Sequence, residues 1–177
     1  MEIDQKTAAA LGWPKLKYAW IERERRWLCG AVPAERVLWS EHITDLYVTG
    51  TRLRLRETVP LNGDAPTLRL SRKADVSASV RLLTSIYLTP EEFACLSSLQ
   101  GAILKKTRRH IGQVHGVEMS VDVFGGNLLG LILAEAEFED MESLKAFPHP
   151  DFAIREVTDN SRYSGGQLAA WGLPEET

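Results

Sequence analysis

The sequence lacks most of the motifs on which small enzymes commonly depend. Its two cysteines, Cys29 and Cys95, have no C-x-x-C spacing, so neither a zinc site nor a disulfide framework is indicated, and both are expected to be buried free thiols. The four histidines show no metal-ligand spacing. No G-x-x-x-x-G-K-[ST] or G-x-G-x-x-G stretch occurs, which excludes a phosphate site made from a glycine-rich loop and a helix N-terminus. There is also no G-x-S-x-G nucleophile elbow.

Targeting signals and an excess of charge are absent as well. The N-terminus lacks the pattern of a secretory signal, and no apolar run approaches the length of a membrane-spanning helix. A formal net charge of −3 gives no overall attraction to nucleic acid or acidic membranes, so we expect a cytoplasmic protein that binds neither. With 177 residues, 44% of them hydrophobic, the chain can form one domain with a full core. We assign residues 1–16 to an N-terminal extension and 17–177 to this domain.

Helix signals are few and lie between longer strand-like segments. Helices are expected over Asp4–Leu11, over Thr89–Leu99 with a capping box formed by Thr89 and Glu92, and after Asp140, which can cap a third helix. Gly165-Gly166 is predicted to be a loop. The fold class is therefore α+β, and most of the structure is expected in strands.

The strand-like segments share an unusual pattern in which charged residues recur at every second position. Glu22, Glu24 and Arg26 would lie on one face of a strand, and the three arginines of Arg52–Arg56 would do the same. Such strands can form an ordinary sheet with one solvated face, or they can close into a barrel with a polar lumen. The alternation by itself satisfies either arrangement.

The signs of these charges are separated onto different segments. This separation fits a phosphate cradle of cations beside a metal site of carboxylates, because Arg and Lys donate charge-assisted hydrogen bonds to phosphate and Mg²⁺ prefers carboxylate oxygen. The alternative is cross-strand ion pairing on a solvated face, which would mix the signs more evenly. The acidic set is Glu22, Glu24, Asp122, Glu135 and Glu137, and the basic set is Arg54, Arg56, Lys73, Arg81, Lys106 and Arg108.

An ordered series of motifs along nearly the whole chain resembles the CYTH superfamily, the triphosphate tunnel metalloenzymes. The family's E-x-E-x-K motif corresponds to Glu22-Arg23-Glu24-Arg25-Arg26, and its basic strand corresponds to Leu53-Arg54-Leu55-Arg56. Further matches, in the same order as in the family, are Lys73, Lys106-Thr107-Arg108, Val121–Gly126, Ala134–Phe138, Glu156-Val157-Thr158 and Arg162-Tyr163. Each motif is weak alone, but the ordered set is specific.

The resemblance implies an eight-stranded antiparallel β-barrel with helices packed outside and a charged tunnel inside. It also implies a metal-dependent hydrolase of inorganic triphosphate or a related compound, with Mg²⁺ or Mn²⁺ as cofactor. Carried over by position, Glu22, Glu24 and Arg26 would be catalytic. Metal ligands would come from Glu22, Glu24, Asp122, Glu135 and Glu137, and the substrate would be bound by Arg54, Arg56, Lys73, Arg81, Lys106, Arg108 and Arg162.

Two departures from the family pattern keep other functions open. The motif lysine is Arg26 here, and arginine keeps the charge but cannot transfer a proton. The segment Arg81–Tyr87 lacks the alternating glutamates found in many triphosphatases. The alternatives are a class IV-type adenylate cyclase and a polyphosphate- or nucleotide-binding module without catalysis. A homodimer formed through an apolar outer patch is a further option.

Overall fold

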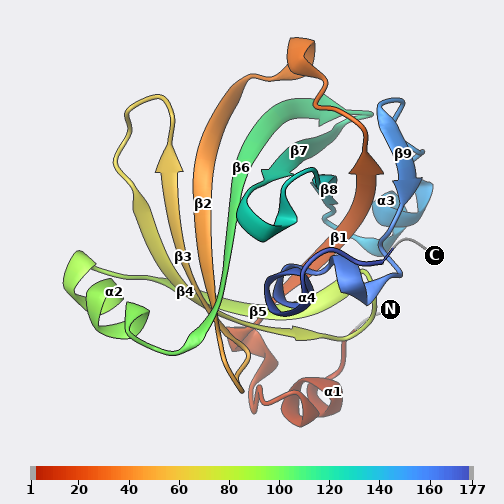
Figure 1. Ribbon diagram of the computed structural model, residues 1–177. Coiled ribbons are helices and arrows are strands. Elements are labelled where there is room, and N and C mark those ends of the chain that lie inside the picture. Colours follow the sequence, from red (N-terminus) through yellow and green to blue (C-terminus); the bar gives the residue numbers. More distant parts are fainter. Residues whose placement is uncertain (1–2, 176–177) are drawn as a thin grey trace.

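The alternating segments form a closed antiparallel barrel in the computed structural model, which describes residues 3–175 (Figure 1). Within this range, eight strands follow one another around the barrel in the order β5-β4-β3-β2-β6-β7-β8-β1, and β1 pairs with β5 to close it. The strands are β1 (Trp20–Cys29), β2 (Trp39–Val48), β3 (Leu53–Pro60), β4 (Thr67–Asp75), β5 (Val80–Tyr87), β6 (Gly101–Val114), β7 (Val117–Phe124) and β8 (Ile132–Glu137). The predicted fold class is confirmed. Of the two arrangements that the alternating charged residues allowed, the structure has the closed barrel and not the open sheet.

Strand β1 has different partners along its length. Residues 20–23 pair with β5, whereas residues 24–28 pair with β8. The far end of β1 carries a ninth strand, β9 (Ala153–Glu156), through residues 27–29. The two carboxylates of the Glu22-x-Glu24 motif therefore lie where β1 passes from one neighbour to the other.

The expected helix caps are present. Asp4 accepts a hydrogen bond from the Thr7 amide at the start of α1 (Gln5–Ala10), and Asp140 accepts one from the Ser143 amide at α3 (Met141–Ala146). Thr89 and Glu92 form the capping box of α2 (Pro90–Ser97). Short 3₁₀ turns complete the connections at Leu16–Tyr18, Ala34–Arg36, Gly126–Leu128 and Ser161–Tyr163.

Apolar residues on the outside of the barrel are covered by two of these helices. Helix α3 and the residues after it, with Leu144 and Phe147, pack over Trp27 and Val121, which are fully buried. The N-terminal segment packs over β4 and β5, where Ala8 and Trp13 join Leu82 in a second cluster. These contacts leave the opposite face of each strand, which carries the charged side chains, directed into the lumen.

A third apolar cluster fills part of the lumen itself. Leu104 shares the lumen-facing side of β6 with Lys106, and it packs with Phe124, Leu133 and Leu168. Leu168 belongs to helix α4 (Gly165–Trp171), which lies against the opening of the barrel (Figure 1). The prediction of a loop at Gly165-Gly166 is wrong, because burial of Leu168 in this cluster outweighs the low helix propensity of the two glycines.

The two cysteines differ in burial. Cys29 is buried, and burial raises the pKa of its thiol to about 11, but Cys95 is exposed. The expectation that both thiols are buried is therefore wrong for Cys95, because α2 lies on the surface and contains no buried residue. Among residues 3–175, no helix has the length and hydropathy needed to cross a membrane.

Candidate active site

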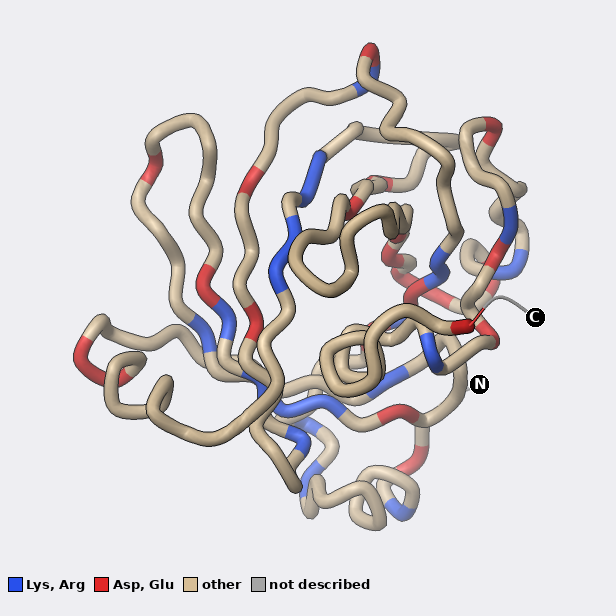
Figure 2. The backbone as a smooth tube through the Cα atoms, viewed as in Figure 1, with Lys and Arg blue, Asp and Glu red and all other residues tan. Residues whose placement is uncertain are grey.

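The lumen contains a cavity of about 870 Å³ lined by charged side chains from six of the strands. This volume is typical of small-molecule sites, but the number of charged groups is unusual for one. The basic lining residues are Arg26, Arg52, Arg54, Arg56, Arg69, Lys73, Arg81, Lys106 and Arg108, and the acidic ones are Glu22, Glu24, Asp75, Glu135 and Glu137. Figure 2 shows that basic positions gather on β3, β4 and β6, whereas acidic positions gather where β1 and β8 meet. The cavity therefore has a cationic side and an anionic side.

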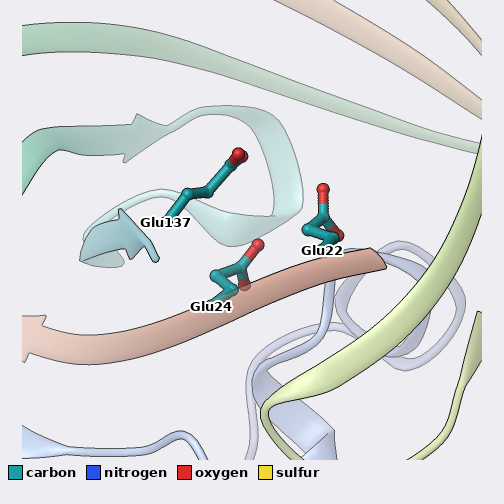
Figure 3. Close-up of side chains that lie close together, drawn as sticks. All are labelled: Glu22, Glu24 and Glu137. Atoms are coloured by element: carbon teal, nitrogen blue, oxygen red, sulfur yellow. The ribbon is translucent and has the colours of Figure 1, made fainter. Parts of the chain in front are cut away.

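Three carboxylates converge on the anionic side (Figure 3). Glu22, Glu24 and Glu137 each offer one oxygen, and these oxygens lie within 4.8 Å of one another. The register explains the convergence, since Glu24 and Glu137 stand directly opposite each other on β1 and β8, and Glu22 follows on the same face of β1. Among residues 3–175, no other group of acidic, histidine or cysteine side chains meets this spacing.

The electrostatic environment differs among the three carboxylates. Burial raises the pKa of Glu24, and the nearby Glu135 adds to this shift. Partial desolvation by the cavity wall and the neighbouring Glu22 raise the pKa of Glu137 as well, although its side chain remains exposed to solvent. For Glu22, burial is outweighed by Lys73 and Arg81, which lower its pKa. The ionised forms of Glu24 and Glu137 are thus disfavoured in this environment, and a bound cation would stabilise them.

The cationic side contains two similar units, each made of one aspartate and two basic residues. On β2, Asp45 accepts hydrogen bonds from Nε and Nη2 of Arg56, both at 2.7 Å, and lies 3.7 Å from Nε of Arg54. On β7, Asp122 accepts hydrogen bonds from Nε and Nη2 of Arg108, also at 2.7 Å, and contacts Lys106. Both aspartates are fully buried.

Lys73 and Arg81 connect the two sides of the cavity. Lys73 Nζ lies 2.8 Å from both carboxylate oxygens of Glu22, and Arg81 Nη1 lies 3.6 Å from Glu22 and from Glu24. Arg26, which is buried, donates a hydrogen bond from Nη1 to the Tyr163 carbonyl, and its Nε lies 2.9 Å from Glu24. These three cations surround the carboxylate cluster and can hold an anion beside a bound metal.

Several buried atoms in the cavity wall make no hydrogen bond. Nε of Arg69 is one of them. Glu24 Oε1 and Arg81 Nε are others, although each lies in an ion pair, 2.9 Å from Arg26 Nε and 3.2 Å from Asp75 Oδ1 respectively. Buried polar atoms normally have partners, so such atoms mark where a ligand would supply them. A buried carboxylate oxygen that accepts no hydrogen bond suits a hard divalent cation, and guanidinium nitrogens that donate none suit phosphate oxygens. The residues present therefore fit both Mg²⁺ or Mn²⁺ and a phosphate compound.

The structure brings most of the predicted site residues to one cavity and divides them in a way that the sequence did not indicate. Among the predicted metal ligands, Asp122 and Glu135 contact Lys106 and Arg108 instead of joining the cluster of Glu22, Glu24 and Glu137. Arg162 is exposed and does not line the cavity.

Other residues in the cavity wall or directly behind it were not predicted from the sequence. Arg69 shares the lumen-facing side of β4 with Lys73, and this alternation was a usable signal. Asp45 had no such signal, because only the pairing of β2 with β3 places it opposite Arg56. The first turn of α4, from Ser164 to Gln167, also lines the cavity. It was not predicted as part of the site because Gly165-Gly166 was expected to be a loop.

Helix α4 depends on a close approach to Tyr47. A Cβ atom at Gly165 would lie 2.1 Å from the Tyr47 hydroxyl, whereas one at Gly166 would lie 3.5 Å from the ring. We expect Gly165→Ala to lower the free energy of unfolding by about 1–3 kcal/mol through overpacking. Gly166→Ala is the matched control and should be neutral or stabilising, since alanine favours the helix. Urea unfolding of both variants measures the difference, and equal midpoints would contradict this packing.

A closed antiparallel barrel with a charged lumen is the architecture of the triphosphate tunnel proteins, and comparisons with known proteins agree with it. No family model matches the chain. A curated relative, the inorganic triphosphatase of Nitrosomonas europaea, is 36% identical over 70 residues, which are 40% of this chain and 46% of that protein. The match thus covers less than half of the relative's length.

Solved structures extend the similarity to most of the barrel. The crystal structure of the inorganic triphosphatase NE1496 has a TM-score of 0.58 and 26% identity, covering 84% of this chain and 93% of that one. The PH1819 protein from Pyrococcus horikoshii shares the fold, with a TM-score of 0.52 and 18% identity over 70% of this chain and 82% of that one. These similarities agree with the resemblance to the CYTH superfamily that the motifs indicated.

Proposed function

We propose that the protein is a divalent-metal-dependent phosphohydrolase that cleaves inorganic triphosphate or another tripolyphosphate compound. The observation that carries this proposal is the meeting of three convergent carboxylates and a cationic wall in one cavity. The partial sequence match to an inorganic triphosphatase and the similarity to the fold of NE1496 support it. Cytoplasmic location remains a prediction from the sequence.

Different residues of the cavity would bind the phosphate chain and hold the metal ion. Arg54, Arg56, Lys106 and Arg108 would hold the phosphate oxygens, and the separation of their strands would keep an extended phosphate chain across the lumen. Glu22, Glu24 and Glu137 would hold Mg²⁺ or Mn²⁺. When bound, such an ion neutralises phosphoryl oxygens and lowers the pKa of water.

Arg26 would stabilise negative charge and would not move a proton. Its guanidinium is fixed between the Tyr163 carbonyl and Glu24, so it faces the place where the carboxylate cluster and a phosphate group would meet. Arginine stays protonated at any pH relevant to proteins. Arg26 therefore supplies the charge of the family's motif lysine without its acid–base chemistry.

One assay tests the proposal. The protein is incubated with inorganic triphosphate, ATP and thiamine triphosphate, each with Mg²⁺ and with Mn²⁺, and every product is quantified. Orthophosphate released together with the shortened chain is the expected result. Cyclic AMP and pyrophosphate from ATP would instead identify a cyclase. Binding of triphosphate by calorimetry without any product would identify a binding module and refute hydrolysis.

The pH dependence of the reaction should reflect Lys73. Burial and the neighbouring Arg54 lower the pKa of Lys73 to about 8, although Glu22 opposes the shift. Above that pH the free enzyme would lose a cation that faces the phosphate, so kcat/KM should fall as the pH rises through about 8. Lys73→Arg keeps the charge and should remove this decline. Parallel pH profiles of the two proteins in the same buffers would show that Lys73 is not the titrating group.

A further inference from the structure

Two buried aspartates stand behind the cations of the lumen wall and do not themselves line the cavity. Arg54, Arg56, Lys106 and Arg108 all line it. Asp45 and Asp122 are fully buried, and the side-chain hydrogen bonds and ion pairs that they form within residues 3–175 are with these cations. A carboxylate in that position cannot reach a ligand in the cavity. Its effect on a ligand must pass through the basic side chains in front of it.

The two units have the same construction. Asp45 is the direct cross-strand partner of Arg56, and Asp122 is the direct cross-strand partner of Arg108. In each unit the aspartate binds the Nε and Nη2 edge of the guanidinium at 2.7 Å. Strands β3, β2, β6 and β7 are consecutive, so the two units form one continuous wall.

This geometry fixes the direction of each guanidinium. A planar fork held by two parallel hydrogen bonds has little freedom to rotate. Within residues 3–175, Nη1 of Arg56 and Nη1 of Arg108 donate no hydrogen bond to a protein group, so these donors are available to a ligand in the cavity. Arg56 and Arg54 keep the pKa of Asp45 well below its usual range in spite of burial, so the carboxylate stays ionised.

We propose that Asp45 and Asp122 are positioning residues that hold Arg56 and Arg108 by one edge and direct their remaining donors toward the phosphate groups. The proposal rests on the proposed function, since it takes a phosphate chain as the ligand of the cavity. Two other roles for these aspartates predict different effects on anion binding. A carboxylate that only reduces the positive charge would weaken anion binding, and a structural ion pair would affect stability alone.

The test is the affinity for inorganic tripolyphosphate, measured by calorimetry in a metal-free buffer with Asp45→Asn and Asp122→Asn. Asparagine keeps the shape but can accept from only one of the two guanidinium donors. If the aspartates position the arginines, each variant should bind about 10- to 100-fold more weakly, as expected for loss of one hydrogen bond to a charged group. The control is Asp151→Asn, which removes the same two-point contact from Arg36 on the exposed surface and should leave binding unchanged.

Each other outcome overturns the proposal. Tighter binding would show that the aspartates only offset charge, because the cavity gains net positive charge in these variants. Unchanged binding with a lower unfolding midpoint, or failure of both variants to fold at low temperature, would show structural ion pairs. Metal-dependent kinetics give a second readout, in which KM should rise while kcat is retained. If the unmodified protein releases no phosphate but the two variants still bind tripolyphosphate more weakly than it does, the positioning role is supported and hydrolysis is refuted. Failure of this proposal can therefore be told apart from failure of the proposed function.

Discussion

Glu24→Gln should reduce metal-dependent phosphate release by about 100-fold or more, the range found when an essential group that stabilises transition-state charge is removed. Glu24 contributes a buried carboxylate to the three-carboxylate cluster, and its Oε1 accepts no hydrogen bond but lies 2.9 Å from Arg26 Nε. Glutamine has the same shape but one ligand oxygen and no charge. Release of orthophosphate from inorganic triphosphate, with Mg²⁺ and with Mn²⁺, measures the loss, and Glu22→Gln should behave in the same way.

Stability separates this effect from misfolding. Burial raises the pKa of Glu24 above its value in the unfolded chain, so the ionised carboxylate costs stability at neutral pH. Glu24→Gln removes this cost but also the ion pair with Arg26, so its unfolding temperature without metal should change little. Added Mg²⁺ or Mn²⁺ should no longer raise that temperature. Glu118→Gln, on the exposed part of β7, is the control and should retain both activity and the metal response. Full activity in Glu24→Gln would remove this residue from the mechanism.

Arg56→Met should also have a large effect, because it should lower both kcat/KM and the free energy of unfolding. Loss of a positioned cation from the lumen wall should lower kcat/KM by about 10²- to 10³-fold. The substitution also leaves Asp45 buried without its two-point partner, which costs about 3–5 kcal/mol of unfolding free energy. Steady-state kinetics and urea unfolding measure the two losses separately.

A double variant distinguishes the two contributions. Adding Asp45→Asn to Arg56→Met removes the uncompensated charge, so much of the stability should return while kcat/KM stays low. Arg36→Met breaks an exposed pair with Asp151 and serves as the control, with little change expected in either property. Recovery of activity in the double variant would show that Arg56 matters only for the fold.

The sequence allowed prediction of the parts of the fold that follow from local alternation. Where charged residues recur at every second position, as in Glu22–Arg26 and Arg52–Arg56, the lumen-facing side follows directly from strand geometry. The caps at Asp4, Thr89 and Asp140 were predictable for the same reason, since each depends on a few neighbouring residues. Closure into a barrel was not fixed by alternation and came from the family resemblance.

The remaining features depend on pairing between distant segments. Asp45 lies in a strand of mixed polarity, and its contact with Arg56 exists only in the register of β2 with β3. Asp122 has the residue type of a metal ligand, but its position opposite Arg108 makes it a partner of cations. Gly165 and Gly166 read locally as a loop, and only the apolar cluster around Leu168 makes them helical.

The change of partner within β1 also has a consequence for how the molecule folds. Residues 20–23 must find 80–83, and residues 24–28 must find 133–137, so closing the barrel requires contacts between distant parts of the chain. Such non-local pairing is slow, and Glu22 belongs to one pairing while Glu24 and Glu137 belong to the other. The three carboxylates therefore meet only when the barrel is closed. A cation bound there would slow opening of the barrel and leave its rate of formation unchanged.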